Sequence, residues 1–197
     1  MEWEFMGSHP AMDFLNTVYS PAGTPVETIG DGGLLLDWVV AAGLLDAPAA
    51  ARLKKRAGTE ALDAAAAEAR KLRKWMADWI ARWSEQPDAD YSAELRRLNS
   101  LLERAPHYRE VVATDHGLHL HEQARIDTPD QLITRVAAQV AALITGEQPE
   151  LVKHCAGAAC TIWFLDRTKA HARRFCSAAS CGNRAKVAAF RERNRSA

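Results

Sequence analysis

Four cysteines are the residues of this chain whose type and spacing point most directly to chemistry. Cys155, Cys160, Cys176 and Cys181 follow the pattern C-x4-C-x15-C-x4-C. A tetrahedral zinc ion needs four sulfur atoms at about 2.3 Å, and two tight turns can each supply two of them. The alternatives are two disulfides or free thiols, and a reducing cytoplasm disfavours the disulfides. The spacing therefore predicts one zinc ion, and it is structural because four thiolates leave no open coordination position for catalysis.

The segments around the cysteines indicate how the chain would build this site. The first pair encloses a turn of small residues, 156–159, and the apolar run Thr161–Leu165 has the composition of a β-strand. We therefore expect a β-hairpin to join the two pairs. Cys181 leads into a helical segment, 185–194, whose N-terminal amides would stabilise thiolate charge. Knuckle, hairpin and helix together predict a treble-clef-like finger.

Charge is distributed unevenly along the chain. The whole sequence is neutral, with 25 basic and 25 acidic residues, whereas residues 151–197 hold ten Lys or Arg against Asp166 and Glu192, a net charge of +8. This switch predicts two domains, residues 1–148 and residues 149–197. The basic domain suits a polyanion such as double-stranded DNA, which the acidic remainder would repel.

The C-terminal helix has a pattern that suits contact with DNA. On a helical wheel Arg184, Arg191 and Arg195 form one basic stripe, and a second basic stripe lies near the opposite side. Alanines cover one flank, and on the other flank Val187 and Phe190 are expected to pack on the zinc hairpin. The predicted DNA contacts are Arg173, Arg174, Asn183, Arg184, Lys186, Arg191, Arg193 and Arg195. The alternative is a solvated surface helix. A single finger buries little DNA, so specific recognition would need a homodimer.

Residues 1–148 have the periodicity of a mainly α-helical domain. A short amphipathic helix or a turn followed by a helix is expected at 8–19. Further helices are expected at 34–42, from Asp46, at 59–84, from 88 or 90 to 104 and at 131–145. Residues 21–33 are rich in Gly, Pro and Thr and predict a loop. Alternating apolar residues at 108–113 and 118–123 flank a turn and predict a β-hairpin. The fold class is thus mainly α with a small β-hairpin, an α+β arrangement.

Two features of this domain have both a structural and a functional interpretation. Trp75, Trp79 and Trp83 recur every four residues, which is typical of a core stripe but also of a pocket wall or dimer face. Near the N-terminus, four polar side chains lie at near-helical spacing: His9, Asp13, Asn16 and Thr17. These four either tie the N-terminus to the helices or form the wall of a pocket for a small-molecule effector.

Composition and motifs argue against several other classes of protein. No apolar run reaches the roughly 20 residues of a membrane helix. The first residues also lack the basic region and the apolar stretch of a secretory signal. A cytoplasmic protein without membrane contact is therefore expected. The sequence has no phosphate-binding glycine loop, no nucleophile elbow and no H-E-x-x-H motif, so no catalytic residues are predicted.

Two segments resemble a known family. Cys181-Gly182-Asn183-Arg184, with Trp163-Phe164-Leu165-Asp166 before it, resembles the CGNR zinc finger, which is named for that tetrapeptide. Residues 9–17 (HPAMDFLNT) resemble the opening motif of the ABATE-type domain that usually precedes this finger. The family is regarded as stress-induced transcription regulators, so the resemblance implies one zinc ion and a role in regulating transcription.

From these patterns we expect a transcription regulator whose zinc-stabilised basic helix contacts DNA and whose N-terminal domain senses a ligand or dimerises. The alternative is a small-molecule-binding protein or enzyme in which the finger is purely structural or binds another protein. The two hypotheses differ in whether the arginines of the last helix are needed for function.

Overall fold

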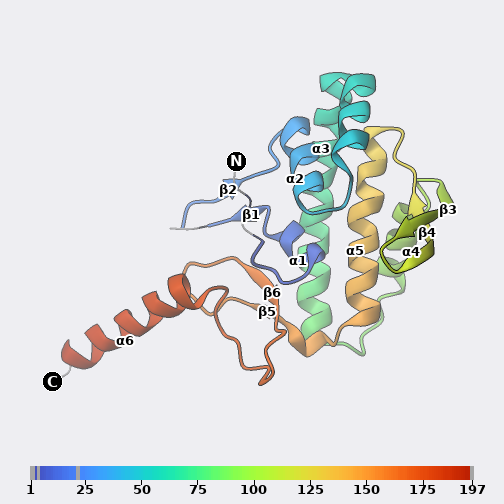
Figure 1. Cartoon of the computed structure of the whole chain (residues 1–197). Helices are drawn as coiled ribbons and strands as arrows, with labels where there is room; N and C mark the ends of the chain where they lie inside the picture. Colours follow the sequence, from blue (N-terminus) through green and yellow to red (C-terminus); the bar gives the residue numbers. More distant parts are fainter. Residues whose placement is uncertain (1–2, 4, 21–22, 196–197) are drawn as a thin grey trace.

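The computed structural model describes residue 3, residues 5–20 and residues 23–195. In it a helical body carries a small cysteine-containing finger, and the final helix projects from this finger into solvent (Figure 1). The body is mainly helical and the strands form small antiparallel pairs, as predicted. None of the helices in the described ranges is long and apolar enough to cross a membrane.

The longest element, α3 (Ala47–Glu85), runs the length of the body. The side chain of Asp46 caps it by accepting from the N–H of Ala49, and Pro48 occupies the first turn, where no amide hydrogen is needed. Gly58 breaks the helix with φ 73° and ψ 165°, a left-handed φ that glycine adopts without strain. The two helices predicted on either side of this glycine are therefore present and joined end to end.

The second helix, α2 (Gly32–Ala41), crosses α3 at very close range. Asp31 caps α2, and the N–H of Gly32 donates to Oδ1 of Asp63 on α3 at 2.8 Å. A Cβ atom at Gly32 would lie 2.3 Å from Leu62, inside the van der Waals contact distance. Only glycine allows the two helices to approach this closely.

Two further helices complete the body, α4 (Ser92–Leu102) and α5 (Leu132–Gly146), and they pack against each other. A 3-10 turn at Pro129–Gln131 leads into α5. The side chain of Gln131 accepts from the N–H of Thr128 at 3.1 Å, which satisfies a backbone donor at the start of the helix. The start and end of this helix agree with the predicted range, 131–145, to within one residue.

The N-terminal segment departs from the prediction. The first helix, α1 (Pro10–Leu15), is short, and β1 (Val18–Tyr19) then pairs antiparallel with β2 (Val26–Glu27). The short helix or turn-helix predicted over 8–19 is present only as α1, because residues 18–19 form a strand, and the predicted loop over 21–33 contains β2.

A contact with α3 holds the strand pair in place, and the hydrophobic periodicity of the sequence cannot predict such a contact. Arg73, in the middle of α3, donates to Oγ1 of Thr17 at 2.7 Å and to Oε1 of Glu27 at 2.9 Å. Burial raises the pKa of Glu27, but the hydrogen bonds from Arg73 and from the N–H of Ile29, with the positive charges of Arg73 and Arg70, together outweigh this and hold the pKa below its usual range. This buried arginine holds the strand pair against the helix.

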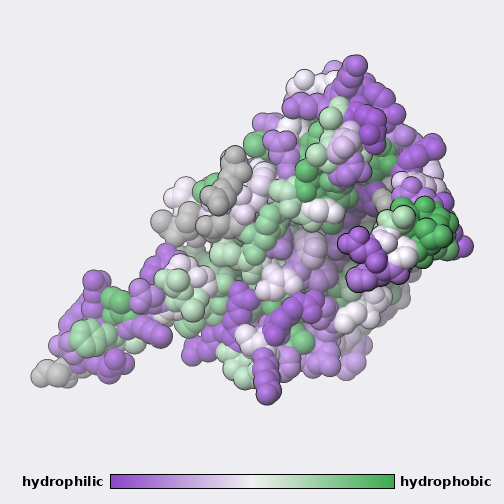
Figure 2. All heavy atoms as spheres, in the orientation of Figure 1, coloured by the Kyte–Doolittle hydropathy of each residue, from purple (hydrophilic) through white to green (hydrophobic). Residues whose placement is uncertain are grey.

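A second antiparallel pair, β3 (His107–Thr114) and β4 (Gly117–Ala124), forms the predicted hairpin at the edge of the body. Val111 and Leu120 face each other across the pair and are each 65% exposed, and Leu118 is 77% exposed. Figure 2 shows the resulting hydrophobic patch over the hairpin. One face of this hairpin is therefore apolar and uncovered.

The finger is built on β5 (Val152–His154), β6 (Trp163–Leu165) and the final helix α6 (Asn183–Arg195). Val152 and Leu165 are buried in the same core as α1 and α3. The finger thus shares the hydrophobic core of the body.

Candidate functional site

The four cysteines come together at one point in the finger. Their sulfur atoms all lie within 4.8 Å of one another, with 3.7 Å between Cys160 and Cys176 and 3.6 Å between Cys176 and Cys181. A tetrahedron of Zn–S bonds of about 2.3 Å has edges of about 3.8 Å, whereas a disulfide needs about 2.05 Å. None of the four cysteines of the sequence is in a disulfide. The cluster therefore fits one tetrahedral metal ion, with four thiolates as ligands.

The β-hairpin encloses the first cysteine pair. Cys155 directly follows β5, and its N–H donates to the carbonyl of Ile162 at 2.9 Å, next to β6. The prediction that the hairpin joins the two pairs is wrong, because the apolar run 161–165 pairs backward with Val152–His154. The second pair is reached instead through the irregular segment 166–175.

Gly157 lets the first turn close on the sulfur cluster. The N–H of Cys160 donates to the carbonyl of Gly157 at 3.0 Å, and a Cβ atom at Gly157 would lie 3.1 Å from Sγ of Cys181. The N–H of Cys176 donates to Sγ of Cys155 at 3.2 Å. Such amide donors stabilise negative charge on sulfur, as a four-thiolate site requires.

Asp166 organises the segment between β6 and the second cysteine pair. Its fully buried carboxylate accepts from the ammonium of Lys153 at 2.6 Å, from the N–H and hydroxyl of Thr168 and from the N–H of Arg173. Burial raises the pKa of Asp166, but these donors outweigh it and hold the pKa well below its usual range. The segment is thus fixed by one ionised side chain.

Arg184 contacts the cluster of four cysteines. Its guanidinium donates to Sγ of Cys181 at 3.0 Å from the first turn of α6. Burial raises the pKa of Cys181, but the hydrogen bonds from Arg184 and the other cysteines outweigh it and lower that pKa to about 7. The helix start and the sulfur cluster are therefore linked by a charge-assisted contact.

One of the polar residues near the N-terminus, Asn16, fastens the body to the finger, and His9 caps the first helix. The Asn16 amide donates to the carbonyl of Trp163 and accepts from its N–H, both at 2.8 Å. His9 caps α1 by accepting from the N–H of Ala11 at 3.1 Å, and burial lowers the pKa of its imidazole. Leu165 donates its N–H to the carbonyl of Gly7 at 2.8 Å.

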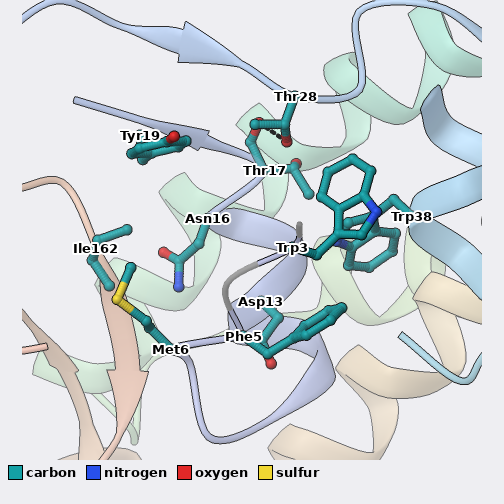
Figure 3. Close-up of a pocket in the computed structure, with 10 residues that line it drawn as sticks. All are labelled: Trp3, Phe5, Met6, Asp13, Asn16, Thr17, Tyr19, Thr28, Trp38 and Ile162. Carbon is teal, nitrogen blue, oxygen red and sulfur yellow. Dashed lines mark hydrogen bonds between the residues drawn. The ribbon is translucent and has the colours of Figure 1, made fainter. Parts of the chain in front are cut away.

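A cavity of about 160 Å³ lies beside this junction (Figure 3). Asp13, Asn16 and Thr17 line it, whereas His9 does not. The finger contributes Ile162 to its wall. Three of the four polar residues singled out in the sequence therefore meet at one cavity, at the contact between body and finger.

Comparison with known families agrees with this arrangement. A family model described as "ABATE: Putative stress-induced transcription regulator" matches residues 8–147, and the model described as "CGNR zinc finger" matches residues 152–194. The chain belongs to the ABATE family. A search of curated proteins gave no match. The four clustered cysteines are thus the metal site of a CGNR finger, as the resemblance implied.

The eight residues predicted to contact DNA do not share one environment in this ABATE protein. Arg173 stacks over the ring of Phe164 at 4.1 Å and donates to Oγ of Ser8 at 3.1 Å, so it lies between finger and body. Arg184 contacts sulfur and is exposed. The other six are exposed: Arg174, Asn183, Lys186, Arg191, Arg193 and Arg195.

The CGNR helix α6 has no buried residue, and its two large apolar side chains are exposed. Val187 is 41% exposed and Phe190 is 57% exposed. The prediction that they pack on the zinc hairpin is wrong, because residues of that hairpin, including Val152 and Leu165, are already buried against the ABATE body. Apolar residues of α6 are therefore presented to solvent beside the basic ones.

The cavity of the ABATE domain also contains residues that sequence analysis missed. Its further lining residues are Trp3, Phe5, Met6, Tyr19, Thr28 and Trp38. These residues come from the N-terminal segment, the strand pair and α2, and no spacing in the sequence connects them. The unusual number of tryptophans, six in the chain, was the one available signal.

Proposed function

We propose that this ABATE-family protein is a DNA-binding transcription regulator of the cytoplasm, with an effector-binding domain at 1–148 and a DNA-contacting finger at 149–197. The observation that carries the proposal is α6, a 13-residue helix with no buried residue that projects away from the body (Figure 1). At 1.5 Å per residue the helix is about 20 Å long, and a B-DNA major groove about 12 Å wide admits it.

The distribution of side chains on α6 supports a role in the major groove. Ala185, Ala188 and Ala189 give one flank low relief, so the helix backbone can approach base edges. Exposed cations at Lys186, Arg191, Arg193 and Arg195 border that flank and suit phosphates on either side. Asn183, in the first turn, lies about 160° around the helix axis from this flank, on the side of Val187 and Phe190, so we propose that it contacts the DNA backbone at the rim of the groove.

In this proposal Arg184 positions the helix and does not itself contact DNA. Because its guanidinium contacts Cys181, it fixes the start of α6 on the cysteine cluster. It supports DNA binding by holding the helix in position, and Arg173 supports it by joining finger and body. The phosphate contacts themselves then belong to Arg174 and to residues 186–195.

The proposed effector site is the cavity at the junction. Asn16 lines this cavity and also holds both backbone groups of Trp163 in the finger. A ligand beside Asp13, Asn16 and Thr17 would therefore act on a residue that positions the finger. This shared side chain is the proposed route from effector to DNA, and it requires that the ligand shift the balance between two positions of the finger.

The proposal is tested by fluorescence anisotropy of a mixed-sequence DNA duplex titrated with the full, zinc-loaded chain at several salt concentrations. We expect binding that weakens with salt, because phosphate contacts release counterions. Reversing two charges of α6, Arg191→Glu with Arg193→Glu, should reduce the slope of log K against log salt by about 2.

The matched control reverses two exposed lysines of the body, Lys54→Glu with Lys55→Glu. This variant has the same net charge as the α6 variant and should bind DNA like the unaltered protein. Absence of binding even at low salt, or equal binding by the two reversed variants, would reject the proposal.

One observation favours the alternative of a small-molecule-binding protein with a structural finger. The finger completes a cavity wall through Ile162 and is buried against the body through Leu165, as a structural cap would be. The matched families suggest a regulatory, non-catalytic protein. Ligand binding that survives charge reversal on α6, in a protein that binds no DNA, would favour this alternative.

A second copy of the chain is the proposed partner of the β3–β4 hairpin. Its uncovered face carries Val111, Leu118 and Leu120, bordered by Arg109 and Glu122, which form a salt bridge of 2.9 Å with each other. Because this ion pair balances its own charge, an identical face can approach it without like-charge repulsion. Two copies joined here would present two fingers to DNA, and α6 is not part of the contact.

A further inference from the structure

The cavity at the junction has an unusual lining for its size. The aromatic rings of Trp3, Phe5, Tyr19 and Trp38 surround it, and Asp13 is the one charged side chain among its ten lining residues. In Figure 3 the two indoles lie together on one side, with Tyr19 and Ile162 opposite them and Asp13 below. A volume of about 160 Å³ is smaller than the pockets that hold drug-sized molecules, so the cavity suits a small ligand.

Hydrogen bonds offset little of the cost of burying the carboxylate of Asp13. Its Oδ1 accepts from the N–H of Gly7 at 2.7 Å, yet burial outweighs this bond and raises the pKa of the carboxyl group. Asp166, also buried, receives an ammonium group and three further donors, and its pKa lies well below the usual range. The comparison indicates that a cation inside the cavity would stabilise the negative charge on Asp13.

Two other polar side chains of the wall, Asn16 and Thr17, are already engaged. Asn16 commits both ends of its amide to Trp163, and Thr17 accepts from Arg73. The positive charge of Arg73 is in turn balanced by Glu27. The cavity therefore offers an anion no uncompensated positive group among its lining residues, and it offers a cation one carboxylate and several aromatic faces.

We propose that this cavity binds a small organic cation, either a protonated amine or a quaternary ammonium ion. The charge of the ligand lies against Asp13, and its alkyl groups lie on the aromatic rings, whose electron-rich faces attract cations. The proposal deepens the effector role given above and rests on it only for the link to DNA, because binding of the cation is a property of the cavity alone.

The test is isothermal titration calorimetry of the full, zinc-loaded chain with choline, tetramethylammonium and methylammonium. At least one of these cations should bind. For choline the matched ligand is 3,3-dimethyl-1-butanol, which has the same shape without the charge and should bind at least tenfold more weakly if choline is the ligand. Absence of heat with all three cations at 10 mM, or equal binding of choline and its neutral isostere, overturns the proposal.

The matched variants are Asp13→Asn and Asp88→Asn, a buried and an exposed aspartate. Asparagine keeps an oxygen that can accept from Gly7, so the first variant should remain folded, with an unaltered thermal unfolding temperature or a higher one. It should lose at least tenfold in affinity for the cation, whereas Asp88→Asn should lose none. Equal affinity of the two variants contradicts a role for Asp13.

DNA titrations of the same samples separate the two proposals. A protein that binds DNA but none of the cations rejects the cation site and leaves the regulator intact. A protein that binds a cation but no DNA rejects the regulator and keeps the site.

Discussion

At the scale of single residues, Asn16 takes the place of a neighbouring β-strand. Its side-chain amide supplies one donor and one acceptor to the backbone of Trp163, as a paired strand would. The outer edge of β6 is thereby satisfied without a third strand, and an exposed edge that could pair with another chain is covered. A side chain of the ABATE motif therefore completes the sheet of the finger.

Arg184 is expected to control how tightly the metal is held. Removing its contact to Cys181 in Arg184→Met should weaken zinc affinity by about tenfold, as is typical when a residue that contacts a metal ligand is lost. Competition with a zinc-chelating indicator measures this. The control is Arg191→Met on the same helix, which should release zinc like the unaltered protein.

Metal analysis of the purified protein tests whether the four cysteines bind zinc. Freshly reduced protein should contain about one equivalent of zinc, and Cys176→Ser should lose it. Equal zinc retention by the two arginine variants would show that the arginine–sulfur contact has no influence on the metal.

Asp13 predicts a specific dependence of stability on pH. Because burial raises its pKa in the folded protein, its contribution to stability is complete below the unfolded pKa of about 4 and is lost as pH rises through the folded pKa. Asp13→Asn has no such loss, so the difference in unfolding free energy between variant and unaltered protein should move in favour of the variant as pH rises.

Chemical denaturation of the two proteins at several pH values between 4.5 and 7.5 checks this. Changes in the zinc site affect both proteins and cancel in the difference. A difference that moves toward the unaltered protein as pH rises would mean that Asp13 is stabilised as the anion.

At the scale of elements, the α2–α3 crossing depends on one glycine. In Gly32→Ala the new Cβ would meet Leu62 at 2.3 Å, so the helices must separate, and we expect a loss of about 2 kcal/mol in unfolding free energy. Gly146→Ala, in the last turn of α5 with open space around it, is the control and should be neutral or slightly stabilising. Guanidinium-induced unfolding measures both variants. An equal loss of unfolding free energy in the two would contradict the expectation.

Elements whose causes are local could be predicted from the sequence. Asp46 and Thr128 mark helix starts, and the alternation around residues 115–117 marks the hairpin, because caps and turns act on neighbouring residues. The strands β1 and β2 could not be predicted, because Arg73 on a distant helix holds them. The four cysteines were predictable because metal ligands need short spacing, whereas the cavity gathers residues from separate segments.

At the scale of the whole molecule, the hairpin face predicts self-association. Replacing two opposed and exposed residues, Val111→Thr with Leu120→Ser, should shift the protein from dimer to monomer in analytical ultracentrifugation. The fold of each copy should be unaffected because both side chains are 65% exposed. Leu95→Ser, at an exposed apolar residue on α4, is the control and should leave the dimer intact. An unaltered protein that is monomeric throughout the concentration range rejects this interface.

The bond between Asn16 and Trp163 also has a consequence for how the chain is completed during translation. The two residues are 147 positions apart, so at 5–20 residues per second a ribosome needs roughly 7–30 s to deliver the second after the first. During that time the N-terminal motif has been synthesised, but the segment of the finger that Asn16 contacts has not. The wall that Ile162 supplies to the cavity arrives last and depends on the cysteine cluster next to it. For the effector site proposed above, a cell short of zinc would therefore accumulate newly made chains in which this site is unfinished, so that metal supply would act on the proposed response through folding.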